Sequence, residues 1–280
     1  MPPSHRARRG VVFLAAAGLV ASACSSTFGG GPEVVERPGW DAVFAADGLT
    51  GTMALHEIGS DRIDVGDEAR AEEPLTPAST FKILNSLIIL ETGVVPDVDT
   101  VLAWDGVDRG SEGWNRDQTL RTAIDVSAVW AYQAWAREVG EDRMDRWVDD
   151  AGYGNEDIGG RLDSFWLDGD LRISALEQVD FLTRFVEGEL PFAERNQQAV
   201  REILVQDVGP GWSWSYKTGL SLRSEHEVGW LVGIVDLETS IWVFALNVDM
   251  TTTGGEPVDP AVRIRVAESI LEAEGVLPER

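Results

Sequence analysis

The sequence has little of the residue types on which common metal sites and catalytic triads depend. Its single cysteine, Cys24, excludes an internal disulfide and any cluster of several thiolate ligands. The three histidines, His5, His56 and His226, leave little material for a histidine zinc site or a Ser-His-Asp triad. We therefore expect no metal cofactor.

Lysine is also scarce, because the 23 basic residues comprise only Lys82 and Lys217 and otherwise arginine. An amine can lose its proton and act as a base or nucleophile, which a guanidinium cannot do. Both lysines are therefore candidates for chemistry. Chance retention in an arginine-rich composition is the alternative, and the counts alone do not decide between them.

Positive charge is scarce overall, and the formal net charge is −25. This balance argues against nucleic acid as a partner, because phosphate binding needs a basic surface. Hydrophobic residues at 44% and charged residues at 25% are typical of a globular protein. At roughly 150 residues a domain, the length is enough for a large core.

The first 23 residues have the pattern of a secretory signal. Three arginines precede the apolar run 11–20, which is too short to span a membrane, and small residues then lead to Cys24. This arrangement resembles a bacterial lipobox, although Ala21 stands where leucine is more usual. We expect an exported lipoprotein in the periplasm or on the outer face of the cell membrane, anchored only at Cys24. Ordinary secretion is the alternative. Residues 24–38, rich in Ser, Gly and Pro, are expected to form a flexible tether.

The remaining chain, 39–280, is expected to form one domain of mixed α/β (α+β) class. Strand patterns occur near both ends, at 51–58, 62–65, 212–217, 228–235 and 241–248, and a helix pattern covers 260–273. The middle is mostly helical, with a capping box at Ser174 and Glu177. One mixed sheet, largely antiparallel, would therefore be built from 39–76 and 207–280 and flanked by helices. A helical lobe at about 95–206 would be inserted in it.

Ser79 and Lys82 form an S-x-x-K pattern at the start of an apolar helix expected over 81–91. Residues at i and i+3 share a helix face, so the amine can approach the hydroxyl. A serine hydroxyl needs an adjacent base, and lysine can be that base only if burial lowers its pKa. Taken alone the pattern is weak, because a serine N-cap followed by a solvated lysine is the better explanation of a chance match.

The second lysine lies in Lys217-Thr218-Gly219, at the end of a strand pattern. A glycine there allows a ligand to approach the backbone closely, although a strand end with a turn glycine is the plainer interpretation. S-x-x-K followed by K-T-G is found together in serine β-lactamases and penicillin-binding proteins. The two motifs in this order make coincidence a poor explanation.

From Thr76 to Gly275 the chain resembles the class D (oxacillinase-type) serine β-lactamases. The resemblance is carried by PASTFKILNSLIILETG (77–93), by Ser127-Ala128-Val129 as an S-x-V motif, and by Tyr153-Gly154-Asn155. It extends to FWLDGDLRISALEQVDFL (165–182) and to YKTG (216–219). The resemblance implies the serine β-lactamase and penicillin-binding-protein fold.

The resemblance also implies catalytic roles. Ser79 would attack the lactam carbonyl, and Lys82 would be carboxylated by carbon dioxide (N6-carboxylysine) and act as general base. Ser127, with Lys217 beside it, would pass a proton to the leaving nitrogen. Trp166 would hold the carbamate through its indole N–H. Core packing for Trp166 and an N-cap for Ser127 are the alternatives.

The implied substrate-binding residues are Val129, Thr218, Gly219, Leu220 and Arg263. The backbone N–H groups of Ser79 and Leu220 would form the oxyanion hole, and many relatives carry an aromatic residue in place of Leu220. Arg263 would bind the substrate carboxylate, with Arg265 as the competing candidate. Tyr153 and Asn155 are expected to support their loop.

The implied activity is hydrolysis of β-lactams, small-molecule substrates, with carbon dioxide or bicarbonate as the only added requirement. A β-lactam sensor and a penicillin-binding transpeptidase or carboxypeptidase are the alternatives. The oligomeric state is left open, a homodimer included.

Overall fold

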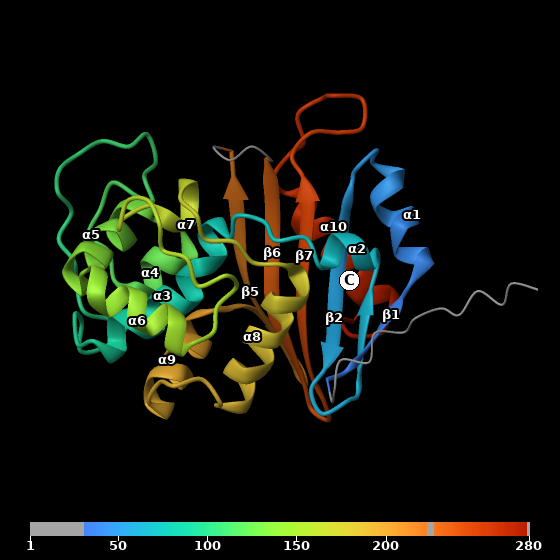
Figure 1. Cartoon of the computed structure of the whole chain (residues 1–280), viewed down its shortest axis with the longest axis horizontal. Coiled ribbons are helices and arrows are strands. Elements are labelled where there is room, and N and C mark those ends of the chain that lie inside the picture. Colours follow the sequence, from blue (N-terminus) through green and yellow to red (C-terminus); the bar gives the residue numbers. More distant parts are fainter. Residues whose placement is uncertain (1–30, 223–226, 279–280) are drawn as a thin grey trace, which may run out of the picture. The chain divides into compact units, whose positions relative to one another are not determined.

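The computed structural model describes residues 31–222 and 227–278, and its central feature over them is a seven-stranded sheet (Figure 1). The strand order is β1-β3-β2-β7-β6-β5-β4, and every pair is antiparallel except β1 with β3. The strands are β1 (Glu33–Glu36), β2 (Gly51–Glu57), β3 (Arg62–Val65), β4 (Val205–Gly209), β5 (Trp212–Ser221), β6 (Val228–Leu237) and β7 (Ile241–Asp249).

Helices cover both faces of this sheet and also form a lobe beside β5 (Figure 1). α1 (Pro38–Ala46) and α10 (Val262–Ala273) pack on one face, and α8 (Ala175–Glu187) packs on the other. The nucleophile region is a short 3₁₀ turn, η1 (Ala78–Phe81), that continues into α3 (Lys82–Glu91). The other helices are α2 (Glu68–Ala71), α4 (Leu120–Asp125), α5 (Val129–Val139), α6 (Glu141–Asp150), α7 (Phe165–Asp168) and α9 (Glu194–Ile203).

The central strands are buried on both faces, which explains their nearly continuous apolar sequences. In β6, Leu231 and Val235 face the core under α1 and α10, whereas Val232 and Ile234 face the core under α8 and the lobe. The same alternation runs through β2 and β7. The sheet thus holds two cores apart and gives the lobe a rigid base.

The predicted fold class and layout are confirmed. The mixed sheet is built from segments at both ends of the chain, and the helical lobe is inserted between these segments in the sequence. The capping box at Ser174 and Glu177 is present. The prediction of a flexible tether over 24–38 is wrong at its C-terminal end. β1 pairs with β3 as the edge strand of the sheet, and α1 begins at Pro38. The strand at 33–36 was not predicted because it is short, does not alternate in polarity, and lies among Gly and Pro residues. The K-T-G motif also lies within β5 and not at its end.

Residues 1–23 and Cys24 lie outside the described residues, so the signal peptide and the lipid anchor stay predictions. Within the described ranges, no helix combines the length and apolar character needed to cross a membrane. Over the same residues, no group of three or more His, Cys, Asp and Glu side chains is arranged to hold a metal ion.

Candidate active site

The turn of η1 brings Ser79 and Lys82 into contact. Lys82 Nζ donates a hydrogen bond to Ser79 Oγ at 2.6 Å. Ser79 lies in the turn and Lys82 begins α3, so the i, i+3 spacing stacks the two side chains on one face. The preceding residue, Ala78, has φ +50°, a region that side-chain-bearing residues rarely adopt. The contact expected from S-x-x-K is therefore confirmed.

Lys82 is completely buried, with an exposed fraction of 0%. Burial lowers its pKa well below 10.5, and the nearby charge of Lys217 lowers it further. Among the described residues, no carboxylate lies within ion-pair distance of its amine, which would otherwise oppose this shift. An amine in this setting is neutral far more readily than an ordinary lysine, as a base for Ser79 must be.

The second lysine, Lys217, lies on β5 and is 3% exposed. Burial and the charge of Arg263 lower its pKa to about 7, although Asp125 opposes this. Its Nζ donates to the carbonyl of Thr218 at 3.1 Å and to Thr218 Oγ1 at 3.3 Å. Lys217 therefore interacts electrostatically with both Lys82 and Arg263, and these interactions, together with burial, favour the neutral form of the two lysines.

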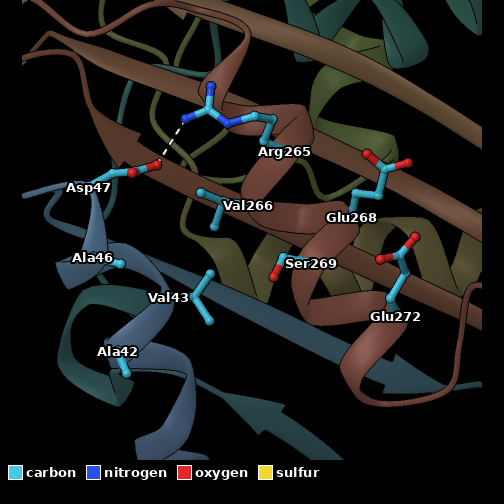
Figure 2. Close-up of a pocket in the computed structure, with 9 residues that line it drawn as sticks. All are labelled: Ala42, Val43, Ala46, Asp47, Arg265, Val266, Glu268, Ser269 and Glu272. Atoms are coloured by element: carbon cyan, nitrogen blue, oxygen red, sulfur yellow. Dashed lines mark hydrogen bonds and ion pairs between the residues drawn. The ribbon is translucent and has the colours of Figure 1, made fainter. Parts of the chain in front are cut away.

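The structure separates the two arginines of the last helix. Arg263 is buried, and this burial lowers the pKa of its guanidinium to about 10. Its guanidinium donates hydrogen bonds to the carbonyls of Pro260 and Gly219. Arg265 instead points to Asp47, 2.9 Å away, in a separate surface pocket between α1 and α10 (Figure 2). Arg263 therefore adjoins β5, and Arg265 has no part in the site.

Two glycines allow these close approaches. A Cβ on Gly219 would lie 3.0 Å from the carbonyl oxygen of Pro77 and 3.1 Å from Thr80 Cγ2, so any larger residue there would have to displace η1 or β5 by a few tenths of an ångström. A Cβ on Gly229 would lie 2.7 Å from Arg263 Cδ and 2.5 Å from Met250 Sδ. Gly229 is paired with Leu220 in the sheet and was not singled out from the sequence. Its importance depends on packing against α10, which local sequence does not reveal.

A cavity of about 470 Å³ opens beside Ser79. Val129 and Leu220 line it, as the resemblance implied. The rest of the lining was not predicted from the sequence and comes from Arg109, Trp114, Trp130, Gln133, Leu167, Ser221 and Leu222. The site thus combines an apolar wall with the nucleophile at its edge, which is typical of a small-molecule pocket.

Ser127 lies in the turn between α4 and α5, with φ +53°. Two indole N–H groups hold this turn: Trp114 Nε1 donates to the carbonyl of Val126 and Trp130 Nε1 to that of Trp114, each at 2.9 Å. Asp125, two residues before Ser127, acts electrostatically on Lys217, so the turn lies in the electrostatic neighbourhood of that lysine. The strained conformation is the kind found at functional sites.

Trp166 is 0% exposed and stacks on Phe81, the residue before Lys82, with ring centroids 5.5 Å apart. Its Nε1 has no hydrogen-bond partner among the described residues. A buried donor left unpaired costs about 1–3 kcal/mol, so it is not explained by core packing alone. The indole N–H is a donor available to an anionic acceptor at this site.

Tyr153 and Asn155 support their loop, as expected. Asn155 Nδ2 donates to the carbonyl of Asp170 at 3.0 Å, and its Oδ1 accepts from the backbone N–H of Arg172. Tyr153 is fully buried, and burial raises the pKa of its phenol so that it stays protonated. Neither side chain lines the cavity.

Comparison with known proteins agrees with this geometry. Residues 59–272 match the penicillin binding protein transpeptidase domain. Beta-lactamase OXA-48 of Klebsiella pneumoniae is 40% identical over 87% of this chain and 90% of its own length. Beta-lactamase OXA-10 of Pseudomonas aeruginosa is 40% identical over 93% of this chain and 98% of its own length.

Among solved structures, the class D β-lactamase FUS-1 (OXA-85) of Fusobacterium nucleatum subsp. polymorphum aligns with a TM-score of 0.82 at 35% identity. The alignment covers 87% of this chain and all of that one. With these similarities in both sequence and fold, the chain belongs to the class D β-lactamase family.

Proposed function

We propose that the protein hydrolyses β-lactams through an acyl-enzyme formed on Ser79. The observation that carries this proposal is the 2.6 Å contact between Ser79 Oγ and a fully buried Lys82 Nζ. The hydroxyl needs a base within hydrogen-bond reach, and a dehydrated amine provides the site for one.

In the acylation step, Ser79 Oγ attacks the lactam carbonyl carbon and its proton passes to the base at position 82. The carbonyl oxygen becomes an oxyanion, which the backbone N–H groups of Ser79 and Leu220 stabilise. The C–N bond then breaks, and the nitrogen takes a proton through Ser127 from Lys217. With a pKa of about 7, Lys217 can both give and regain a proton near neutral pH.

The residues around Lys82 fit a carbamate formed there from carbon dioxide. Carbamate formation requires a neutral amine, which the burial of Lys82 favours. The unpaired indole N–H of Trp166 supplies a donor for an added negative charge. When present, the carbamate supplies a general base both for Ser79 and for the water that releases the product.

The substrate carboxylate would be bound by Lys217, Thr218 and Arg263. Two opposite charges at 4 Å gain about 4 kcal/mol at an effective dielectric constant of 20. The many acidic groups of the surface act from farther away and are screened beyond about 8–10 Å at ordinary salt. A carboxylate can therefore bind in this site despite a net charge of −25.

Counting turnovers tests the proposal. The purified protein is mixed with a chromogenic cephalosporin, and we expect many turnovers per molecule and a covalent adduct, seen by intact mass, that Ser79→Ala abolishes. One stoichiometric burst without further product would instead indicate a sensor. Because the matched domain is named for penicillin-binding transpeptidases, release of D-alanine from a D-Ala-D-Ala peptide is assayed in parallel.

We also propose, from the sequence pattern, that the protein is exported and lipidated at Cys24. Cells grown with labelled palmitate should incorporate the label into this protein, and Cys24→Ser should abolish incorporation. Secretion without any label in the wild-type protein would contradict the anchor and leave simple export.

A further inference from the structure

The turn that presents Ser79 is strained and needs contacts that hold it. Ala78 adopts φ +50° although it has a Cβ. Pro77, at the start of the turn, has no side-chain group that could cap it, so the turn depends on hydrogen bonds from other residues. Strained backbone of this kind persists only where surrounding contacts determine it.

Thr80, the residue after the nucleophile, closes the turn. Its backbone N–H and its hydroxyl both donate to the carbonyl of Pro77, at 3.2 Å and 2.7 Å. The two bonds enclose Ala78 and Ser79 between them. Since the only hydroxyl proton of Thr80 is used in this way, Thr80 Oγ1 can only accept from any other partner.

Gln178, on α8, is the partner that donates to Thr80. Its Nε2 donates to Thr80 Oγ1 at 2.9 Å and to the phenol oxygen of Tyr153 at 3.2 Å. Thr80 and Gln178 are each 1% exposed and Tyr153 is 0% exposed, so water does not compete for these bonds. α8 is itself fixed by the capping box at its start and by packing on β7 and β2.

We propose that Gln178 is a positioning residue for acylation: by donating to Thr80 it holds the strained turn in the conformation that places Ser79 Oγ against Lys82. The inference rests on the proposed function of Ser79 as nucleophile. Gln178 lies on α8, on the opposite face of the sheet from α1 and α10, and its side chain does not line the cavity. The inference therefore gives a role in the reaction to a residue outside the cavity.

Other contacts of the turn leave this role to Gln178. Trp230 Nε1 donates to the carbonyl of Thr76 at 2.9 Å, which anchors the chain before the turn. Gly219 lets β5 lie against Pro77 without a bond to a side chain of the turn. Gln178 therefore supplies a hydrogen bond that reaches the side chain next to Ser79 from outside the turn, and it also donates to the phenol of Tyr153, which itself interacts with Thr80.

Gln197 offers a matched control. It is a buried glutamine on α9, 6% exposed, and its Nε2 donates to the carbonyls of Leu190 and Phe192 at 3.2 Å and 2.9 Å. It makes no bond to η1. Replacing either glutamine by leucine removes a buried donor, but only Gln178→Leu should disturb the nucleophile.

The test compares single-turnover acylation of the wild type, Gln178→Leu and Gln197→Leu by a chromogenic cephalosporin. Saturating bicarbonate is present, and only protein that is folded by circular dichroism is used. A displacement near 1 Å at a reacting group costs about a hundredfold in rate. We expect acylation by Gln178→Leu to fall about tenfold to a hundredfold with little change in substrate affinity. Gln197→Leu should acylate within about twofold of wild type, even where its melting temperature falls.

Thr80 variants keep the test decisive if Gln178→Leu does not fold. Thr80→Val, nearly the same shape without the hydroxyl, should lose at least as much acylation as Gln178→Leu, because it also removes the bond to the Pro77 carbonyl, whereas Thr80→Ser should retain most of it. The double variant should lose no more than Thr80→Val alone, because Thr80→Val already removes the bond between Gln178 and Thr80.

Wild-type acylation rates in folded Gln178→Leu, or in Thr80→Val where the former does not fold, would overturn the positioning role. If instead the wild type itself gives no adduct on Ser79, the proposed function fails and this inference falls with it, a result distinct from a variant that acylates at the wild-type rate.

Discussion

Replacing Lys217 by methionine should stabilise the fold while abolishing activity. The amine is 3% exposed and has a pKa of about 7 in place of 10.5. At about 1.4 kcal/mol for each pH unit between these values, holding it charged costs on the order of 5 kcal/mol. Methionine fills similar space without that cost, and apolar replacement of buried charge is often stabilising.

The pH dependence of unfolding shows whether the buried amine destabilises the fold. Between pH 7 and pH 10.5 the unfolded chain binds the proton of Lys217 more strongly than the fold, so wild-type stability rises with pH. The advantage of Lys217→Met should therefore be full at pH 7 and below and should close toward pH 10.5. Urea unfolding between pH 6.5 and 9.5 measures it, as the difference in unfolding free energy between variant and wild type.

Arg265→Met is the control, because this cation is exposed and paired with Asp47. Its effect should stay within about 1 kcal/mol and should not vary over this pH range. A difference between Lys217→Met and wild type that is equally independent of pH would refute the conclusion that burial lowers the pKa of Lys217.

Three further predictions concern the substrate and the base. Trp166→Phe keeps the stack on Phe81 but removes the indole N–H, so half-maximal activity should require about tenfold or more bicarbonate; an unchanged bicarbonate titration would contradict the donor role. Arg263→Ala should raise KM for penicillins at least about tenfold, whereas Arg265→Ala should not change it; equal effects would contradict the assignment of the carboxylate site. Lys82→Ala should abolish deacylation, shown by an adduct that persists in intact-mass spectra, and rapid loss of that adduct would oppose a base at this position.

The nucleophile and its base were predictable because their relation is local. Ser79 and Lys82 are three residues apart in consecutive helical turns, so the local spacing puts both side chains on one face. The sheet was predictable for a different reason. The strand patterns near both ends of the chain are apolar, and such strands are buried by pairing with one another. Lys217 became a candidate because lysine is scarce in this sequence and because it lies in the K-T-G motif, and the structure shows that its side chain is buried.

The rest of the site depends on packing between distant segments. Arg263 and Arg265 are two residues apart on α10, and only the position of β5 and α1 shows which of them is buried. Arg109 and Trp114 line the cavity from a segment without helix or strand pattern. Gln178 resembles any buried polar residue of an amphipathic helix until its bond to Thr80 is seen.

The scarcity of lysine allows the central claim to be measured directly. Protein labelled with ¹³C at lysine Cε should show a resonance for each of Lys82 and Lys217, assigned with Lys217→Arg. In an NMR pH titration, the Lys82 signal should show that the amine loses its proton far below pH 10.5, and the signal should shift when bicarbonate is added. A Lys82 signal that titrates near 10.5 and ignores bicarbonate would contradict the account.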